Sequence, residues 1–174
     1  MDNKALYNLS YGVFMLSTRD KDKVNGCITN TCIQIANSPT RVAISVLNTN
    51  YTCDLLKKSR IFALSMLDQT VTFETIKHFG FQSGRDVDKF EGLSLPTDMN
   101  EIPYMGWQTC AVLSCKVLDS MDLGSHTLFI GSTGRQSAKR QCSINLRRLS
   151  KQCEAQAREK TGGPQNCGMA MQDL

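Results

Sequence analysis

Residues 25–52, NGCITNTCIQIANSPTRVAISVLNTNYT, place neutral polar side chains at the ends of apolar, β-branched segments. We expect strands at 25–36 and 41–47, joined at Asn37-Ser38-Pro39, and then a polar turn that opens a short helix. The polar set is Asn25, Thr29, Asn30, Thr31, Asn48, Asn50 and Thr52. These amides and hydroxyls include no catalytic base, so they suit an uncharged heterocycle edge and a phosphate better than hydrolysis. The alternative is an ordinary β-hairpin with polar ends.

The rest of residues 1–131 is typical of short strands with few helices. We expect strands at 11–18, 60–67, 107–118 and 126–131. We expect short helices at 3–10, 52–59 and 71–79. About six strands without regular βαβ alternation favour an antiparallel β-barrel over a doubly wound parallel sheet. The sequence contains no G-x-G-x-x-G after a strand and no G-x-x-x-x-G-K-[ST], which argues against a Rossmann fold and a P-loop.

Cysteine spacing and the lack of a long apolar run indicate the cellular environment. Eight cysteines stand at 27, 32, 53, 110, 115, 142, 153 and 167, and none form a C-x-x-C. Residues 27 and 32, like 110 and 115, are separated by an odd spacing, which puts two side chains on opposite faces of a regular strand. We therefore expect no metal site and reduced, mostly buried thiols. No apolar run approaches the ~18 residues of a membrane span, and the N-terminus lacks a signal-peptide pattern, so we expect a cytoplasmic protein.

Charge and aromatic content both change near residue 131. Residues 132–174 hold eight basic and three acidic residues, a net charge of +5, whereas residues 1–131 hold twelve basic and thirteen acidic residues, a net charge of −1. The last aromatic residue is Phe129. We therefore expect a folded domain at 1–131 and an atypical, poorly packed basic tail at 132–174.

The turn Asn48-Thr49-Asn50-Tyr51-Thr52 is the first candidate site. Backbone N–H groups at a helix N-terminus, together with hydroxyl and amide side chains, form an anion site. The alternative is that Thr52 only caps its own helix.

The loop HFGFQSGRDVDKF, residues 78–90, is the second candidate. Gly80 and Gly84 allow a ligand to approach the backbone closely. Ser83, Arg85 and Lys89 can donate to a phosphate. The alternative is a solvated surface loop. The third candidate is GSHTLFIG, residues 124–131, which carries His126, one of two histidines in the chain; the alternative there is a structural histidine.

These segments resemble the flavin reductase-like family, the FMN-binding split barrels, over residues 5–131. The loop FGFQSGRDVDKF is closely similar to a stretch in the branch that is often fused to rubredoxin. The segment 124–131 resembles the family's G-x-H-x-[LI]-x-x-G strand, and residues 29–32 resemble its T-[AN]-[NT]-[ST] run. The resemblance implies a Greek-key split β-barrel that forms a homodimer, with FMN near the subunit interface.

The resemblance also assigns roles to individual residues. Residues Thr29, Asn30, Thr31 and Cys32 would line the isoalloxazine ring, with Cys32 where the family commonly has a small hydroxyl residue. The turn with Asn48, Asn50 and Thr52 would receive the FMN phosphate, together with Ser83, Gly84, Arg85 and Lys89. His126 would lie close to the flavin, where nicotinamide or another electron partner approaches.

The implied reaction is hydride transfer from NAD(P)H to FMN, followed by electron delivery to free flavin, rubredoxin, iron(III) or oxygen. One alternative is an FMN-binding electron carrier that does not use nicotinamide. Another is a nucleic-acid-binding barrel that uses the basic tail, although the tail lacks an aromatic stacking platform. We expect neither a nucleic-acid nor a membrane partner.

The tail also suggests a shifted reading frame. Permitted codons for STGRQSAKRQCSINLRRLSKQ, read one base later, can encode VPAGKVLSDNAQSTYADYQN, which resembles the strand and Tyr-rich helix that follow in the family. Continuing in that frame can give NAKPKPEKKPAARKTAGWRCKI, which looks like a Lys/Pro linker that runs into the start of a rubredoxin, whose iron site opens with a C-x-x-C. We therefore expect residues from about 132 onward to be frame-shifted, which sequencing of the coding DNA tests.

Overall fold

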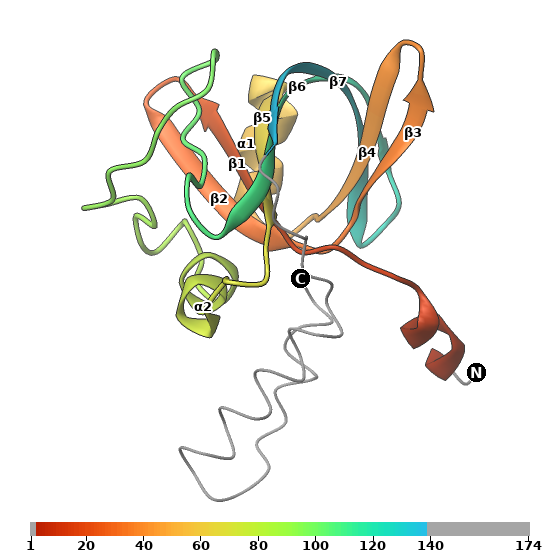
Figure 1. The fold of residues 1–174 in the computed structure, drawn as a ribbon, viewed down its shortest axis with the longest axis horizontal. Coiled ribbons are helices and arrows are strands. Elements are labelled where there is room, and N and C mark those ends of the chain that lie inside the picture. The colour runs from red at the N-terminus through yellow and green to blue at the C-terminus, as the bar shows by residue number, and fades with distance from the viewer. Residues whose placement is uncertain (1–2, 139–174) are drawn as a thin grey trace, which may run out of the picture.

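Seven antiparallel strands form one sheet in the computed structural model, which describes residues 3–138. The strands are β1 (Phe14–Asp20), β2 (Lys23–Thr29), β3 (Cys32–Asn37), β4 (Thr40–Leu47), β5 (Ile61–Leu67), β6 (Thr109–Asp122) and β7 (His126–Ala138). They pair in the order β2-β1-β5-β6-β7-β4-β3, and the sheet curls into a barrel (Figure 1). Its two edges, β2 and β3, do not pair with each other, so the barrel is split between them. The predicted antiparallel split barrel is confirmed, with seven strands where about six were expected.

The strand predicted at 25–36 is wrong, because the chain breaks there into β2 and β3. The break falls at Asn30 and Thr31, whose side chains bond to each other at 2.8 Å. The backbone N–H of Thr31 donates back to Thr29 Oγ1 at 3.4 Å. Local side-chain bonds of this kind compete with a sheet ladder. The break carries the chain from one edge of the sheet to the other, which apolar patterning alone does not reveal.

Two helices and a short 3₁₀ segment complete the described elements. Helix α1 (Tyr51–Ser59) follows β4, and α2 (Phe73–Gly80) follows β5, while the 3₁₀ segment spans Asn3–Asn8. Helix α1 buries Cys53, Leu55 and Leu56, and α2 buries Ile76 and Phe79. Each helix therefore presents one apolar face to the sheet, and the short helices predicted at 52–59 and 71–79 correspond to α1 and α2.

The apolar side chains form two clusters. The first fills the barrel and includes Leu16, Ile44, Leu56, Phe62 and Phe129. The second joins β1, β2 and β5 to α2 and includes Met15, Ile28, Leu67, Ile76 and Phe79. Strand β2 contributes to both clusters, with Cys27 in the first and Ile28 in the second, so it lies between the barrel interior and α2.

Strand β7 continues to Ala138, beyond both the strand end predicted at Gly131 and the domain boundary predicted after it. It pairs with β6 as far as Ala111↔Ala138. Strand β6 also extends further than predicted, to Asp122. The remainder of the predicted tail, residues 139–174, lies outside the described residues, so the frame shift and poor packing stay predictions. Within residues 3–138, no helix is both long and apolar enough to cross a bilayer.

Candidate functional site

A cavity of about 230 Å³ opens where β2, the end of β4, the start of α1 and the loop after α2 meet. Its lining includes Cys27 and Thr29 of β2, Leu47 of β4, Thr49 to Tyr51 of the turn, and residues 80–83 of the loop. The first two candidate segments from the sequence therefore come together. The lining side chains include no Asp, Glu, Lys, Arg or His.

Asn50, not Thr52, caps α1. The Asn50 side chain accepts from the Thr52 backbone N–H at 3.0 Å, in the geometry of an N-cap. Thr52 is fully buried, and its Oγ1 accepts from Asn25 Nδ2 at 3.0 Å. The helix cap therefore lies two residues before the position that the sequence predicted. The sequence leaves this choice open because both Asn and Thr are good caps.

Asn48 ties the turn to the hairpin between β6 and β7. Its Nδ2 donates to Asp122 Oδ1 at 3.1 Å and to Gly124 O at 2.8 Å, and its Oδ1 accepts from Thr127 Oγ1 at 2.5 Å. The Gly124 N–H and Asn48 hold the pKa of Asp122 below its usual value. Asn48 therefore positions the turn and does not line the cavity.

Ser83 and Gly84 bring the loop close to the turn. Ser83 lines the cavity, and its Oγ accepts from the Arg85 backbone N–H at 3.1 Å, which leaves its hydroxyl proton for a ligand. A Cβ on Gly84 would lie 2.1 Å from Asn25 Oδ1. A side chain at residue 84 would thus collide with the amide that supports Thr52.

Arg85 lies at the rim, over the first turn of α1. Its guanidinium donates to Asp54 Oδ2 at 2.5 Å and lies 5.0 Å from the centroid of the Tyr51 ring. Tyr51 also lines the cavity, so its ring lies between the Arg85 guanidinium and the cavity. Sequence reasoning did not mark Tyr51 and Asp54 as site residues. Their i, i+3 spacing puts them on one face of α1, but the helix predicted at 52–59 began after Tyr51.

Lys89 is buried and is not among the residues that line the cavity. Its Nζ donates to Gly26 O at 2.9 Å and to Phe79 O at 2.7 Å. Burial lowers the pKa of Lys89, while the nearby Cys27 acts in the opposite direction. The observed bonds join the loop to β2 and α2, whereas the predicted phosphate contact stays a prediction.

Cys27 lines the cavity from β2, and sequence reasoning did not mark it as a site residue. Burial raises the pKa of its thiol, and the Thr52 side chain, the charge of Lys89 and the Asn50 side chain oppose that rise. The thiol is therefore held neutral beside the turn. No sequence signal distinguishes it from an ordinary strand cysteine.

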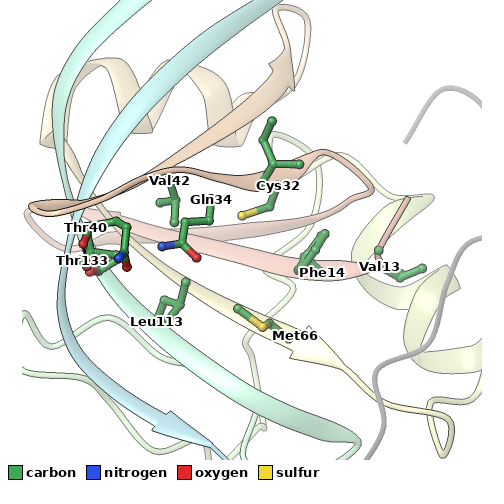
Figure 2. A pocket seen from close by; sticks show the side chains of 12 residues that line it. Val13, Phe14, Cys32, Gln34, Thr40, Val42, Met66, Leu113 and Thr133 are labelled. Carbon is green, nitrogen blue, oxygen red and sulfur yellow. Dashed lines mark hydrogen bonds between the residues drawn. The ribbon is translucent and has the colours of Figure 1, made fainter. Parts of the chain in front are cut away.

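The four residues of the predicted ring-lining run do not share one surface. Thr29 lines the cavity and its Oγ1 donates to Ser45 O at 3.3 Å. Cys32 lines a different, larger cavity of about 510 Å³ between β3 and the start of β1, where Phe14, Gln34 and Met66 also point inward (Figure 2). Burial raises the pKa of Cys32 to about 12. Asn30 and Thr31, in the break between β2 and β3, are not among the residues lining either cavity.

His126 stands on the same face as a cavity residue. It is the register partner of Leu47 across the antiparallel pair of β4 and β7, and directly opposed residues share a face. The His126 Nδ1 lies 2.8 Å from Ser125 Oγ. Within the described residues, no cluster of three or more His, Cys, Asp and Glu side chains could hold a metal ion.

The sequence matches the flavin reductase like domain family over residues 6–159. The chain belongs to this family. A flavin reductase-like domain binds flavin and acts in oxidoreduction, so the family accounts for a cavity lined by neutral hydrogen-bonding groups. The match extends past the boundary predicted at residue 131.

Two curated relatives share this domain. The high molecular weight rubredoxin of Moorella thermoacetica is 35% identical over 132 residues, which cover 76% of this chain and 58% of that protein. The ferric-chelate reductase (NAD(P)H) of Archaeoglobus fulgidus is 32% identical over 131 residues, which cover 75% of this chain and 78% of that protein. The predicted closeness to the rubredoxin-fused branch is confirmed.

The fold is also similar to a solved structure, the NADH:FAD oxidoreductase SgcE6 of Streptomyces globisporus C-1027. The TM-score is 0.74 at 19% identity, over 82% of this chain and 85% of that one. This likeness concerns the fold alone.

The residues around the cavity fit a flavin phosphate. The start of α1 supplies a helix N-terminus, Ser83 and Thr49 supply hydroxyls, and Arg85 supplies a cation at the rim. Thr29 and Leu47 continue the lining toward β2 and β4, with neutral and apolar groups suited to an uncharged ring.

Proposed function

We propose that this flavin reductase-like domain is an FMN-dependent oxidoreductase that passes electrons from NAD(P)H to an acceptor. The observation that carries the proposal is the cavity in which the N-terminus of α1 meets Ser83 and Thr29. A phosphate fits the first two groups, and an uncharged ring fits the third. Bound flavin would supply the redox chemistry itself, accepting a hydride and releasing electrons.

The residues of the chain would bind and orient the flavin. Asn50 fixes the backbone of the turn, because its side chain accepts from the Thr52 N–H and its carbonyl from the Cys53 N–H. The phosphate would then meet the positive end of the α1 dipole beside Ser83. At about 230 Å³ the cavity is smaller than a typical ligand pocket of about 300–1,000 Å³. We infer that it takes the phosphate and its side chain, while the ring extends along Leu47 toward His126.

Selection of FMN over FAD is part of this proposal. The Arg85 side chain, with Tyr51 and Asp54, stands at the phosphate end of the cavity. FMN ends in a phosphate monoester, whose oxygens would meet the Arg85 guanidinium. In FAD the same phosphate continues into an adenylate, which would have to pass that guanidinium. The solved relative SgcE6 is described as an NADH:FAD oxidoreductase, so FAD is the natural competitor in the test.

We propose a homodimer as the functional unit, formed through the outer face of β3, β4, β7 and β6. Ile33 opposes Ala43, which opposes Ile130, and Met121 opposes Leu128, so these side chains share one face with His126. Ile33 is 61% and Met121 62% exposed, large values for apolar side chains on one surface. The flavin ring would then lie at the edge of the interface.

The dimer can be tested by light scattering during gel filtration. Ile33→Asp with Met121→Asp should convert a dimer into a monomer, because burying a carboxylate opposes association. Lys77→Asp, a charge change at an exposed position of α2, which packs on β2 and not on this face, serves as the control. A wild-type monomer, or an unchanged dimer in the double variant, contradicts this interface.

The acceptor is proposed from the relatives. One relative is a high molecular weight rubredoxin, of which this chain spans 58%, and the other a ferric-chelate reductase (NAD(P)H). We therefore propose a rubredoxin-type protein or a ferric chelate as acceptor, with free flavin and oxygen as further choices. The cytoplasmic location stays a prediction.

The absorption spectrum of the purified protein tests the function. We expect flavin bands, FMN as the nucleotide released on denaturation, and anaerobic bleaching by NADH or NADPH. A protein that binds neither FMN nor FAD would overturn the proposal. Flavin bands that only a reduced protein donor bleaches would favour the electron carrier over the NAD(P)H oxidoreductase.

A further inference from the structure

The Arg85 guanidinium has two partners, and both belong to the first turn of α1. Tyr51 is the first residue of the helix and lines the cavity, and Asp54 follows three residues later on the same face. The guanidinium lies over the Tyr51 ring and donates to the Asp54 carboxylate. An acidic side chain therefore holds the cation at the mouth of a site that we assign to an anion.

This ion pair is accessible to water. The Arg85 and Asp54 side chains are 48% and 40% exposed. Exposed pairs of this kind are weak, because water screens the attraction and ordering two side chains costs entropy. A phosphate monoester carries nearly two negative charges and three acceptor oxygens, so it competes well for a guanidinium.

The backbone around Arg85 is held independently of that ion pair. Its N–H donates to Ser83 Oγ, and Gly84 packs on Asn25. Further along, His78 Nε2 lies 2.7 Å from Lys89 O, and Lys89 Nζ bonds to Gly26 and Phe79. The side chain of Arg85 can change partner while the loop stays in place.

We propose that Arg85 is a transferable cation, for which Asp54 and the phosphate of the flavin compete. Asp54 thereby sets the affinity and the release rate of FMN without touching it, and Tyr51 supports the guanidinium beside the cavity. The inference rests on the proposed function. It makes Asp54 a negative regulator of phosphate binding and Arg85 a specificity residue for the phosphorylated flavin over riboflavin.

Titration of FMN and of riboflavin into the wild type and three variants tests this inference. Asp54→Asn should tighten FMN by about three- to tenfold, since Arg85 is released to the phosphate. Arg85→Gln should weaken FMN by about tenfold or more, since one charge-assisted contact is lost. Neither change should alter riboflavin binding by more than about twofold.

The double variant separates partner exchange from simple repulsion. If Asp54 acts through Arg85, Asp54→Asn should tighten FMN far less in the Arg85→Gln background than alone. Equal tightening in both backgrounds would mean that Asp54 only repels the phosphate, and would overturn the exchange. Glu101→Gln is the matched control, because it breaks the Arg19–Glu101 ion pair and removes one negative charge outside the cavity lining.

Two other outcomes also decide the matter. If Asp54→Asn and Arg85→Gln lower the affinity for FMN and for riboflavin by the same factor, the ion pair only holds the loop against α1, and the inference is wrong. If the wild type binds FMN and every variant binds it with the same affinity, the inference is wrong, but the proposed function is not contradicted. Wild type that binds no flavin removes the proposed function, and the inference falls with it. Thermal melts of each variant confirm that it is folded.

Discussion

A buried ammonium needs acceptors, and Lys89 finds two backbone carbonyls on different elements. Lys89→Met keeps most of the apolar stem and removes the charge. We expect the free energy of unfolding to fall by about 3 kcal/mol, because Gly26 O and Phe79 O lose their donor. Urea denaturation of the flavin-free protein measures this.

The same variant distinguishes the structural role of Lys89 from the phosphate role predicted for it. A direct phosphate contact would lower FMN affinity but not riboflavin affinity, and would leave the stability of the flavin-free protein unchanged. Lys58→Met removes a similar charge from an exposed helix position and provides the control.

His126 shares a face with Leu47, which lines the candidate cavity. We expect His126→Ala to retain the flavin bands and to slow reduction by NADH at saturating concentration, by about 10- to 100-fold if the side chain orients the nicotinamide. Stopped-flow absorbance measures the rate. Unchanged reduction, or loss of the flavin itself, would contradict the role. Ser125→Ala removes the hydroxyl beside Nδ1 and should have a smaller effect.

At the scale of elements, the loop after α2 approaches the start of α1 closely at Gly84, because this residue has no side chain. Gly84→Ala puts a methyl group against Asn25 Oδ1, so the amide that supports Thr52 has to move. We expect a loss of about 1–3 kcal/mol in the free energy of unfolding, and weaker FMN binding. Thermal unfolding and FMN titration measure these two effects.

Gly134→Ala is the matched control for Gly84→Ala. Its Cβ would meet Ser114 O at 3.5 Å and Met99 Sδ at 3.6 Å, which are ordinary contacts. That variant should keep its melting temperature within a few degrees and bind FMN normally. Equal behaviour of the two alanine variants would refute the steric role of Gly84.

At the scale of the whole molecule, buried thiols make the stability of the barrel depend on pH in the alkaline range. Burial raises the pKa of Cys32 and Cys115 to about 12, from an ordinary thiol value of 9.0. Above pH 9 the unfolded chain releases these protons while the folded chain retains them. Their contribution to stability is therefore complete below pH 9 and is lost as the pH rises toward 12.

We expect the melting temperature in reducing buffer to fall between pH 7.5 and pH 10.5, and to fall less in Cys115→Ala, although other groups also titrate there. The comparison of slopes isolates the thiol, because lysines and tyrosines are common to both proteins. Parallel slopes for wild type and variant would show that Cys115 does not contribute.

Local pattern was enough to predict most of the barrel and the parts of the candidate site. Alternating apolar residues located the strands, and short amphipathic segments located α1 and α2 to within a few residues. The turn at 48–52 and the Gly-containing loop at 80–84 were recognised because their backbones need polar and small residues. Each of these properties depends on neighbours a few positions away.

Only the tertiary structure decided which partner each polar side chain takes. Lys89 and Arg85 look alike in the loop sequence, yet one bonds to Gly26, 63 residues away, and the other to Asp54, 31 residues away. The break after Thr29 likewise sends Thr29 and Cys32 to different cavities. Sheet register and packing across these separations choose among chemically equivalent partners, so a local pattern can supply the groups of a site but not their assignment.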